Sequence, residues 1–305
     1  MKYLALIALV FAFAACGNRN GRPDVGSVPV GDVRIERFDT AFFSLDSNNI
    51  VPGLYRLNQK YPWFTADFVG NILGAGPLSD TSRMAFAAAR QFLTTYYPVR
   101  DSIEARYRDL GWLEKELKQG FKYVKYYFPQ YRLPEKEVAF IGPFDGPGIA
   151  LTSHALAIGL QSYAGRNFSY YISQQGQDMY PQYISRKFEP EYITANCLRN
   201  LSEDVCPDSS DGRPMIEQMI VKGRYWWLGG KLQPDAPDSI VTGYSQAQLR
   251  WCASMRRLSG VIFYRTTSIL PIPISSRTIS ERIRRRWVCR TDRRGISGPG
   301  SGGRS

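Results

Sequence analysis

Residues 137–163 read EVAFIGPFDGPGIALTSHALAIGLQSY, and this stretch decides the fold class. Residues 137–141 (EVAFI) form a short apolar run bounded by turn residues, which is typical of a buried strand. Residues 142–148 (GPFDGPG) form a loop, because glycine and proline interrupt regular structure. Residues 149–163 are apolar again, and we predict either a helix or a strand that continues into a helix. Residues 33–39 alternate between apolar and polar side chains, which predicts a second strand.

Helical patterns lie on both sides of this stretch. The clearest is an apolar stripe that repeats every three or four residues and stops before Pro129. The sequence therefore predicts an α+β fold, a mostly helical single domain with a small sheet. The predicted helices are 83–97, 102–128, a helix that begins at Pro190, 214–228 with Ile216, Met219, Ile220 and Tyr225 on its inner face, and a helix capped by Ser245.

The first sixteen residues, MKYLALIALVFAFAAC, indicate the compartment. Lys2 precedes an apolar run that is too short to cross a bilayer, since a spanning helix needs about 20 apolar residues. A charged start and an apolar core are typical of a secretory signal. Because small residues precede Cys16, we predict that residues 1–15 are a lipoprotein signal peptide and that acyl chains are attached to Cys16. The alternative is an ordinary signal peptide in which Cys16 merely follows two alanines.

The remaining chain divides by composition into a tether at 16–32, a domain at 33–255 and an atypical tail at 256–305. The formal net charge is +12, and the tail carries most of it, with twelve arginines against Glu281 and Asp292. The tail is open to three interpretations, which are a basic disordered segment, a nucleic-acid arm and out-of-frame translation. We expect no nucleic-acid partner for an exported protein and favour out-of-frame translation.

Histidine and cysteine are too sparse for the common metal sites. His154 is the single histidine, and HALAI at 154–158 lacks both the glutamate and the second histidine of a zinc-protease helix. We interpret His154 as a packed core residue. Cys197 and Cys206 leave open a disulfide in an oxidising periplasm or two free buried thiols. We predict no metal, no cofactor and no catalytic residue.

Two further features are candidates for binding. The loop at 142–148 lacks the glycine order and the lysine of a phosphate-binding loop, so we interpret it as a turn, with the lining of a cleft as the alternative. Aromatic side chains cluster at 123–131 and 225–227, and most of them are expected in the core. The candidates for a cleft or an interface are His154, Tyr126, Tyr127, Trp226 and Trp227.

Several blocks occur together along the chain in a fixed order. They are VRIERFD at 33–39, KYYFP at 125–129, YAG at 163–165, YISRKFEPEYI at 183–193, EQMI at 217–220 running on to Tyr225, and YS at 244–245 with QL at 248–249 and Trp251. With the N-terminal signal, these blocks resemble the gliding-motility lipoprotein GldB family over roughly residues 33–252.

The resemblance implies a non-enzymatic, lipid-anchored envelope protein that supports the gliding machinery or an associated secretion system through protein contacts. The expected partners are the membrane, reached through the acyl anchor, and envelope proteins of that machinery. We expect the outer membrane, facing the periplasm, because Gly17 follows Cys16 in place of the aspartate that commonly retains lipoproteins at the inner membrane. Family members continue with ordered sequence where this chain becomes arginine-rich, which favours out-of-frame translation of the tail.

The family is similar in its middle to predicted zinc-dependent proteases. Residues 152–163 would then take the place of the metal-binding helix, and Ala155 and Ile158 depart from the protease pattern. The resemblance therefore implies a zincin-like scaffold without zinc. The alternative function is a degenerate zincin-like envelope hydrolase or peptidase that uses His154 or a carboxylate.

The anchor prediction is tested by labelling cells with an acyl-chain probe. We expect label on the wild-type chain and none on Cys16→Ala, because the thiol is the predicted attachment point. Equal labelling of the two proteins would refute the anchor.

Overall fold

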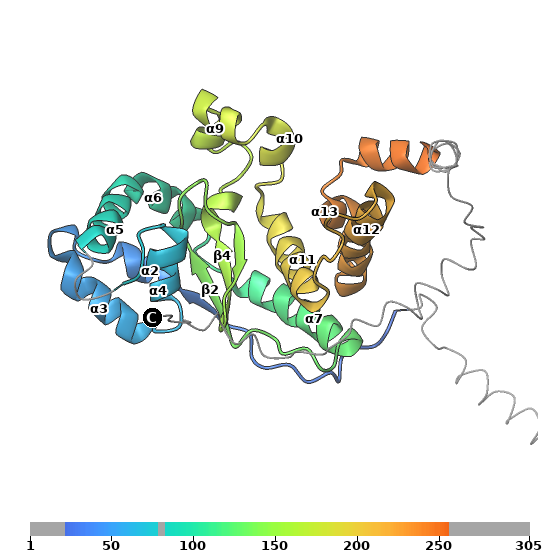
Figure 1. Ribbon diagram of the computed structural model, residues 1–305, viewed down its shortest axis with the longest axis horizontal. Coiled ribbons are helices and arrows are strands. Elements are labelled where there is room, and N and C mark those ends of the chain that lie inside the picture. Colours follow the sequence, from blue (N-terminus) through green and yellow to red (C-terminus); the bar gives the residue numbers. More distant parts are fainter. Residues whose placement is uncertain (1–21, 79–82, 256–305) are drawn as a thin grey trace, which may run out of the picture.

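Four short strands form one mixed sheet in the middle of the fold (Figure 1). They are β1 (Ile35–Arg37), β2 (Lys136–Phe140), β3 (Ile149–Leu151) and β4 (Ala155–Gly159), in the order β1-β2-β4-β3. The strands β1, β2 and β4 run parallel, and β3 pairs antiparallel with β4. The computed structural model describes residues 22–78 and 83–255. The expected α+β fold, mostly helical with a small sheet, is confirmed.

The remaining described elements are helical. The α-helices are α2 (Phe38–Phe43), α3 (Ile50–Lys60), α4 (Thr65–Asp67), α5 (Arg83–Thr95), α6 (Tyr97–Arg106), α7 (Gly111–Tyr127), α8 (Ser169–Ile172), α9 (Gln174–Met179), α10 (Gln182–Ser185), α11 (Ile193–Val205), α12 (Met215–Leu232) and α13 (Asp238–Thr242). Short turns of other helix types are η1 (Ser47–Asn49), η2 (Phe68–Ile72), η3 (Leu160–Tyr163) and η4 (Pro190–Tyr192), and residues 246–255 are also helical.

The central strands β2 and β4 are buried on both faces, as their continuous apolar sequences predict. Val138, Phe140 and the run 155–158 have no exposed surface. On one side, Phe140 packs against the rings of Phe64 and Phe68, with centroids 5.7 and 6.2 Å away. These rings belong to an aromatic cluster contributed by α2 to α5, and α7, α11 and α12 lie on the other side (Figure 1).

The expectation for residues 149–163 is only partly correct. The helical alternative is wrong, because these residues form the β3–β4 hairpin and then the 3-10 turn η3. The segment proposed for a metal-binding helix is therefore a strand. Gly159 ends β4 beneath the 142–148 loop, and its N–H donates to the carbonyl of Gly148 at 2.8 Å. A Cβ at Gly159 would lie 2.5 Å from the Pro147 carbonyl oxygen, so the loop closes over β4 only with glycine there.

The single helix predicted over 102–128 is two helices, because the chain breaks between α6 and α7. Tyr107 at the break is buried, and its hydroxyl donates to the carbonyl of Tyr163 at 2.6 Å. Arg37 donates from Nη1 to the carbonyl of Tyr107 at 2.8 Å. Asp109 Oδ1 then accepts the N–H of Gly111 at 2.8 Å, where α7 begins. These long-range bonds outweigh the local helical pattern.

The tether prediction is wrong for residues 22–32, because these residues pack along the domain. Val25 is buried in the core. Lys122 on α7 donates to the carbonyl of Gly26, and Lys118 pairs with Asp32 at 3.2 Å. Cys16 and residues 256–305 lie outside the described residues.

The Cys197–Cys206 disulfide is excluded. Cys197 is a free, buried thiol within α11 and makes no bond to Cys206. Nine residues of helix span about 13 Å, which is well beyond the reach of a disulfide.

One buried acid lies within the central sheet. The carboxyl of Glu137 on β2 is buried, and burial raises its pKa to about 7, with the nearby charge of Glu114 acting in the same direction. An unfolded glutamate ionises near 4.5, so between pH 4.5 and 7 the unfolded chain loses this proton and the folded chain keeps it. The free energy of unfolding therefore falls as the pH rises through this window.

We predict that Glu137→Gln removes this pH-dependent fall in the free energy of unfolding. At pH 8 the free energy of unfolding of the variant should exceed that of the wild type by up to about 3 kcal/mol, since one pKa unit corresponds to about 1.4 kcal/mol. Chemical denaturation at pH 5 and pH 8 measures the difference. Glu36→Gln on the neighbouring strand is the control; it removes an ion pair with Lys136 but should keep the pH dependence of the wild type. Identical pH dependence in all three proteins would contradict the prediction.

Candidate functional site

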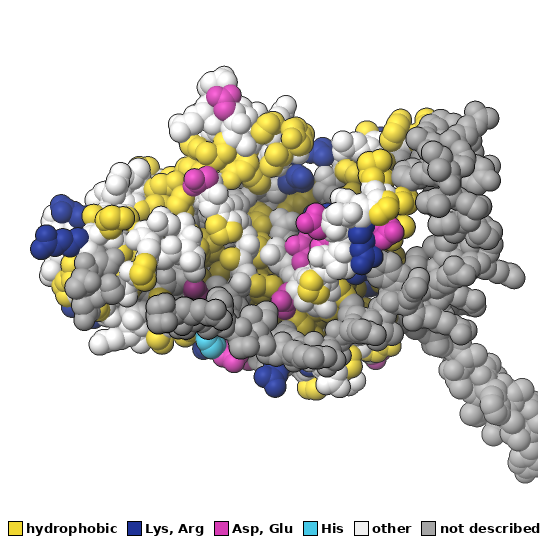
Figure 2. All heavy atoms as spheres, viewed as in Figure 1, with side chains coloured by type: hydrophobic (Ala, Val, Ile, Leu, Met, Phe, Trp, Pro, Cys, Tyr) yellow, Lys and Arg dark blue, Asp and Glu magenta, His cyan; other side chains and the backbone are white. Residues whose placement is uncertain are grey.

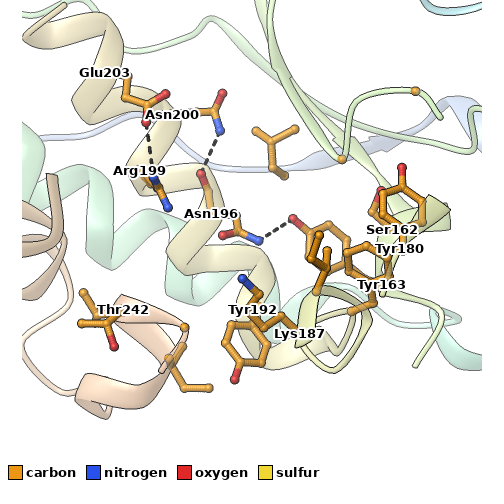
Figure 3. Close-up of a pocket in the computed structure, with 18 residues that line it drawn as sticks. Ser162, Tyr163, Tyr180, Lys187, Tyr192, Asn196, Arg199, Asn200, Glu203 and Thr242 are labelled. Atoms are coloured by element: carbon orange, nitrogen blue, oxygen red, sulfur yellow. Dashed lines mark hydrogen bonds and ion pairs between the residues drawn. The ribbon is translucent and has the colours of Figure 1, made fainter. Parts of the chain in front are cut away.

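A polar cavity of about 470 Å³ opens beside the sheet (Figures 2 and 3). In Figure 2 the surface is hollowed between the α9–α10 region at the top and the α12–α13 region at the right. One wall comes from the end of the 142–148 loop and from Ser162 and Tyr163 on η3. The opposite wall comes from α11, and α13 and the segment 184–192 complete the lining.

Helix α11 presents one polar stripe to this cavity (Figure 3). Asn196, Arg199, Asn200 and Glu203 follow the three- and four-residue spacing of one helix face, while Cys197, Leu198 and Leu201 are buried in the core. Asn196 Nδ2 donates to the hydroxyl of Tyr163 at 2.9 Å, which joins the two walls. Arg199 Nε lies 3.3 Å from Glu203 Oε1. This stripe is not among the predicted candidates, although its spacing is present in the predicted helix beginning at Pro190.

Lys187 brings a positive charge into the cavity. Burial lowers the pKa of Lys187, and the charges of Arg186 and Arg199 act in the same direction. The side-chain stem packs against Gly243 at the end of α13. Its ammonium makes no hydrogen bond or ion pair with any residue of 22–78 or 83–255.

Glu189 holds the Lys187 segment in place. Its carboxylate accepts from Arg106 Nη2 at 2.8 Å and from Arg166 Nε at 2.7 Å. Burial acts to raise the pKa of Glu189, but the hydrogen bonds from Arg166 and the two positive charges keep it below its ordinary value. The N–H of Gly165 also donates to the carbonyl of Phe188. The chain just after η3 is thereby tied to the chain just after Lys187.

A second cavity, of about 790 Å³, lies between α7, η4 and the proline-rich connector before α13. Trp112, Tyr123 and Leu232 contribute apolar surface to it. Its polar members Arg106 and Glu116 are already bonded, Arg106 to Glu189 and Glu116 to the hydroxyl of Thr194.

None of the five candidate residues from the sequence lines either cavity. The prediction that His154 is a packed core residue is wrong. It lies in the β3–β4 turn with its side chain half exposed and Nδ1 3.5 Å from Glu135 Oε2. Thr152 Oγ1 accepts the backbone N–H groups of His154 and Ala155, so the tight turn carries the imidazole out of the sheet.

The other four candidates lie on two separate helices. On α7, Tyr126 is exposed and its ring meets that of Tyr127 edge to face, with centroids 5.1 Å apart. On α12, Trp226 packs against Tyr244, and Trp227 is 62% exposed beneath the ammonium of Lys231. The fold brings the two tyrosines together and the two tryptophans onto one helix, but it does not join these pairs in one site.

The predicted inner face of α12 is wrong for three of its four residues. Tyr225 is buried, together with Val221, Leu228 and Leu232, which face the domain. Ile216, Met219 and Ile220 are exposed and continue the same surface as Met215 and Trp227. Apolar residues thus occur on two faces of α12, and the pattern alone does not tell which of them is buried. We call the surface of Met215, Ile216, Met219, Ile220 and Trp227 the outer face of α12.

The described part of the chain holds neither a metal-binding cluster nor a helix suited to span a membrane. Within residues 22–78 and 83–255, histidine, cysteine and acidic side chains do not gather in groups of three that could hold a metal. Over the same residues, no helix combines the length and the apolar character needed to span a bilayer.

A family model described as gliding motility protein GldB matches residues 18–257. Searches of curated proteins and of solved structures find no match to the chain.

Proposed function

Because the chain belongs to the family of the gliding motility protein GldB, we propose that it is a lipid-anchored envelope protein that supports gliding, or an associated secretion machinery, through protein contacts. The family match carries this proposal. It begins at residue 18, two residues after Cys16. We extend the proposal to an anchor in the outer membrane, because Gly17 follows Cys16 in place of aspartate.

The outer face of α12 is the surface that we assign to a protein partner. Exposed methionine and tryptophan side chains of this kind supply apolar contact area, and tryptophan is enriched among residues that dominate binding energy. Lys231 on the same helix places its ammonium over the ring of Trp227, so the edge of this face next to Trp227 is polar. The partner's matching surface should therefore be apolar at its centre.

The hydrolase alternative finds less support. His154, its histidine candidate, lies at the β3–β4 turn and is not among the residues lining either cavity. Its Nδ1 lies 3.5 Å from the carboxylate of Glu135, which is itself well exposed. We therefore assign no catalytic role to His154.

We predict that Met219→Gln combined with Trp227→Gln stops gliding while the protein stays folded and membrane-bound. Both side chains are exposed, so the fold should be unaffected, whereas removal of two central contacts should weaken partner binding by more than about thirtyfold. Cell displacement on a surface is measured beside immunoblots of the membrane fraction.

Two matched variants control this experiment. Glu217→Gln changes an exposed residue of the same helix, and His154→Ala removes the histidine candidate of the hydrolase alternative; both strains should glide normally. Normal gliding of the double variant at wild-type protein level would overturn the α12 assignment. Loss of gliding in His154→Ala at normal level would favour the hydrolase.

A further inference from the structure

The cavity beside η3 contains a cation without a counter-ion. Glu203 is the one acid in its lining, and this carboxylate pairs with Arg199 rather than with Lys187. The charges that act on the Lys187 ammonium, those of Arg186 and Arg199, are both positive. An anion entering the cavity would therefore relieve repulsion that the described chain leaves uncompensated.

Neutral donors lie on the facing wall. Tyr163 is 3% exposed, and its hydroxyl accepts a hydrogen bond from Asn196, but its own O–H has no acceptor among the described residues. The hydroxyl of Ser162 is likewise without a partner in the described chain. A buried O–H that donates to nothing costs free energy, so a ligand acceptor there would be favoured.

Gly148 keeps these hydroxyls accessible. A Cβ at this position would lie 3.0 Å from Ser162 Oγ and 3.7 Å from the Tyr163 hydroxyl oxygen. The space in front of the two donors therefore exists because residue 148 has no side chain.

We propose that this cavity binds a small polar ligand through one carboxylate, with the Lys187 ammonium as its charge partner and the hydroxyls of Ser162 and Tyr163 as neutral donors. A single uncompensated charge matches a monoanion better than a phosphate dianion, which proteins commonly hold with several cations or with backbone N–H groups. Pro143 and Pro147 remove such N–H groups from the adjoining loop. A volume of about 470 Å³ suits a molecule the size of a monosaccharide or a dipeptide.

The side-chain oxygens of Asn196 and Asn200 indicate which other groups the ligand carries. Both amides line the cavity and donate through their nitrogens, while their oxygens accept nothing from the described chain. They would accept O–H or N–H groups next to the carboxylate. A sugar acid and a peptide carboxyl terminus both carry this combination. The inference goes beyond the proposed function, and neither depends on the other.

Titration calorimetry on the purified full chain in detergent tests the proposal. The probes are glucuronate against neutral glucose, and N-acetyl-Ala-Ala against its C-terminal amide, with inorganic phosphate as a further probe. We expect one of the two carboxylates to bind saturably and its uncharged counterpart to bind at least about tenfold more weakly. The pair that binds identifies the source of the carboxylate.

Three variants connect that binding to this cavity. Lys187→Gln and Gly148→Ala should each weaken binding of the carboxylate probe by about tenfold or more. The first removes the positive charge, and the second fills the space in front of Ser162. Lys115→Gln, an exposed lysine on α7, should bind as the wild type does. Thermal unfolding confirms that each variant is folded.

Three outcomes would overturn the proposal. They are no saturable binding of either carboxylate, tighter binding of phosphate than of both carboxylates, and unchanged affinity in folded Lys187→Gln.

Discussion

The parallel pairing of β2 with β4 is the constraint on which the other elements depend. Both strands are buried on both faces, so each side of the sheet has to be covered by helices. The aromatic cluster of α2 to α5 covers one side through Phe140, and α7 and α11 cover the other. The chain leaving β4 continues directly into η3, so Ser162 and Tyr163 are set in position by the sheet itself.

A few long-range polar contacts then place the cavity walls. The hydroxyl of Tyr107 holds η3, the amide of Asn196 joins η3 to α11, and Glu189 joins the segment after η3 to the segment after Lys187. Each contact satisfies a buried or half-buried polar group, and together they leave Lys187 as the charge without a described partner. The cavity thus exists because these hydrogen bonds hold the segments around the sheet in fixed positions relative to one another.

Local sequence predicted the elements whose signals are local. The apolar run of β2, the end of α7 before Pro129 and the Ser245 cap, with its reciprocal hydrogen bonds to Gln248, all appear as expected. The break at Tyr107 was missed because its cause lies 56 residues away, at the carbonyl of Tyr163. The orientation of α12 was missed because two of its faces are apolar. The exposed position of His154 was missed because, in the sequence, a turn residue beside an apolar strand looks like part of that strand. Lys187 was missed because an unpaired charge is visible only after its neighbours are placed.

We propose that the chain acts through the outer face of α12, on a partner in the gliding machinery. Crosslinking in living cells tests this proposal, with a photoreactive amino acid in place of Met219 and, as the control, in place of Glu217. We expect position 219 alone to crosslink to an envelope protein whose loss also stops gliding. Equal crosslinking from both positions, or none from position 219 in cells that glide, would contradict it.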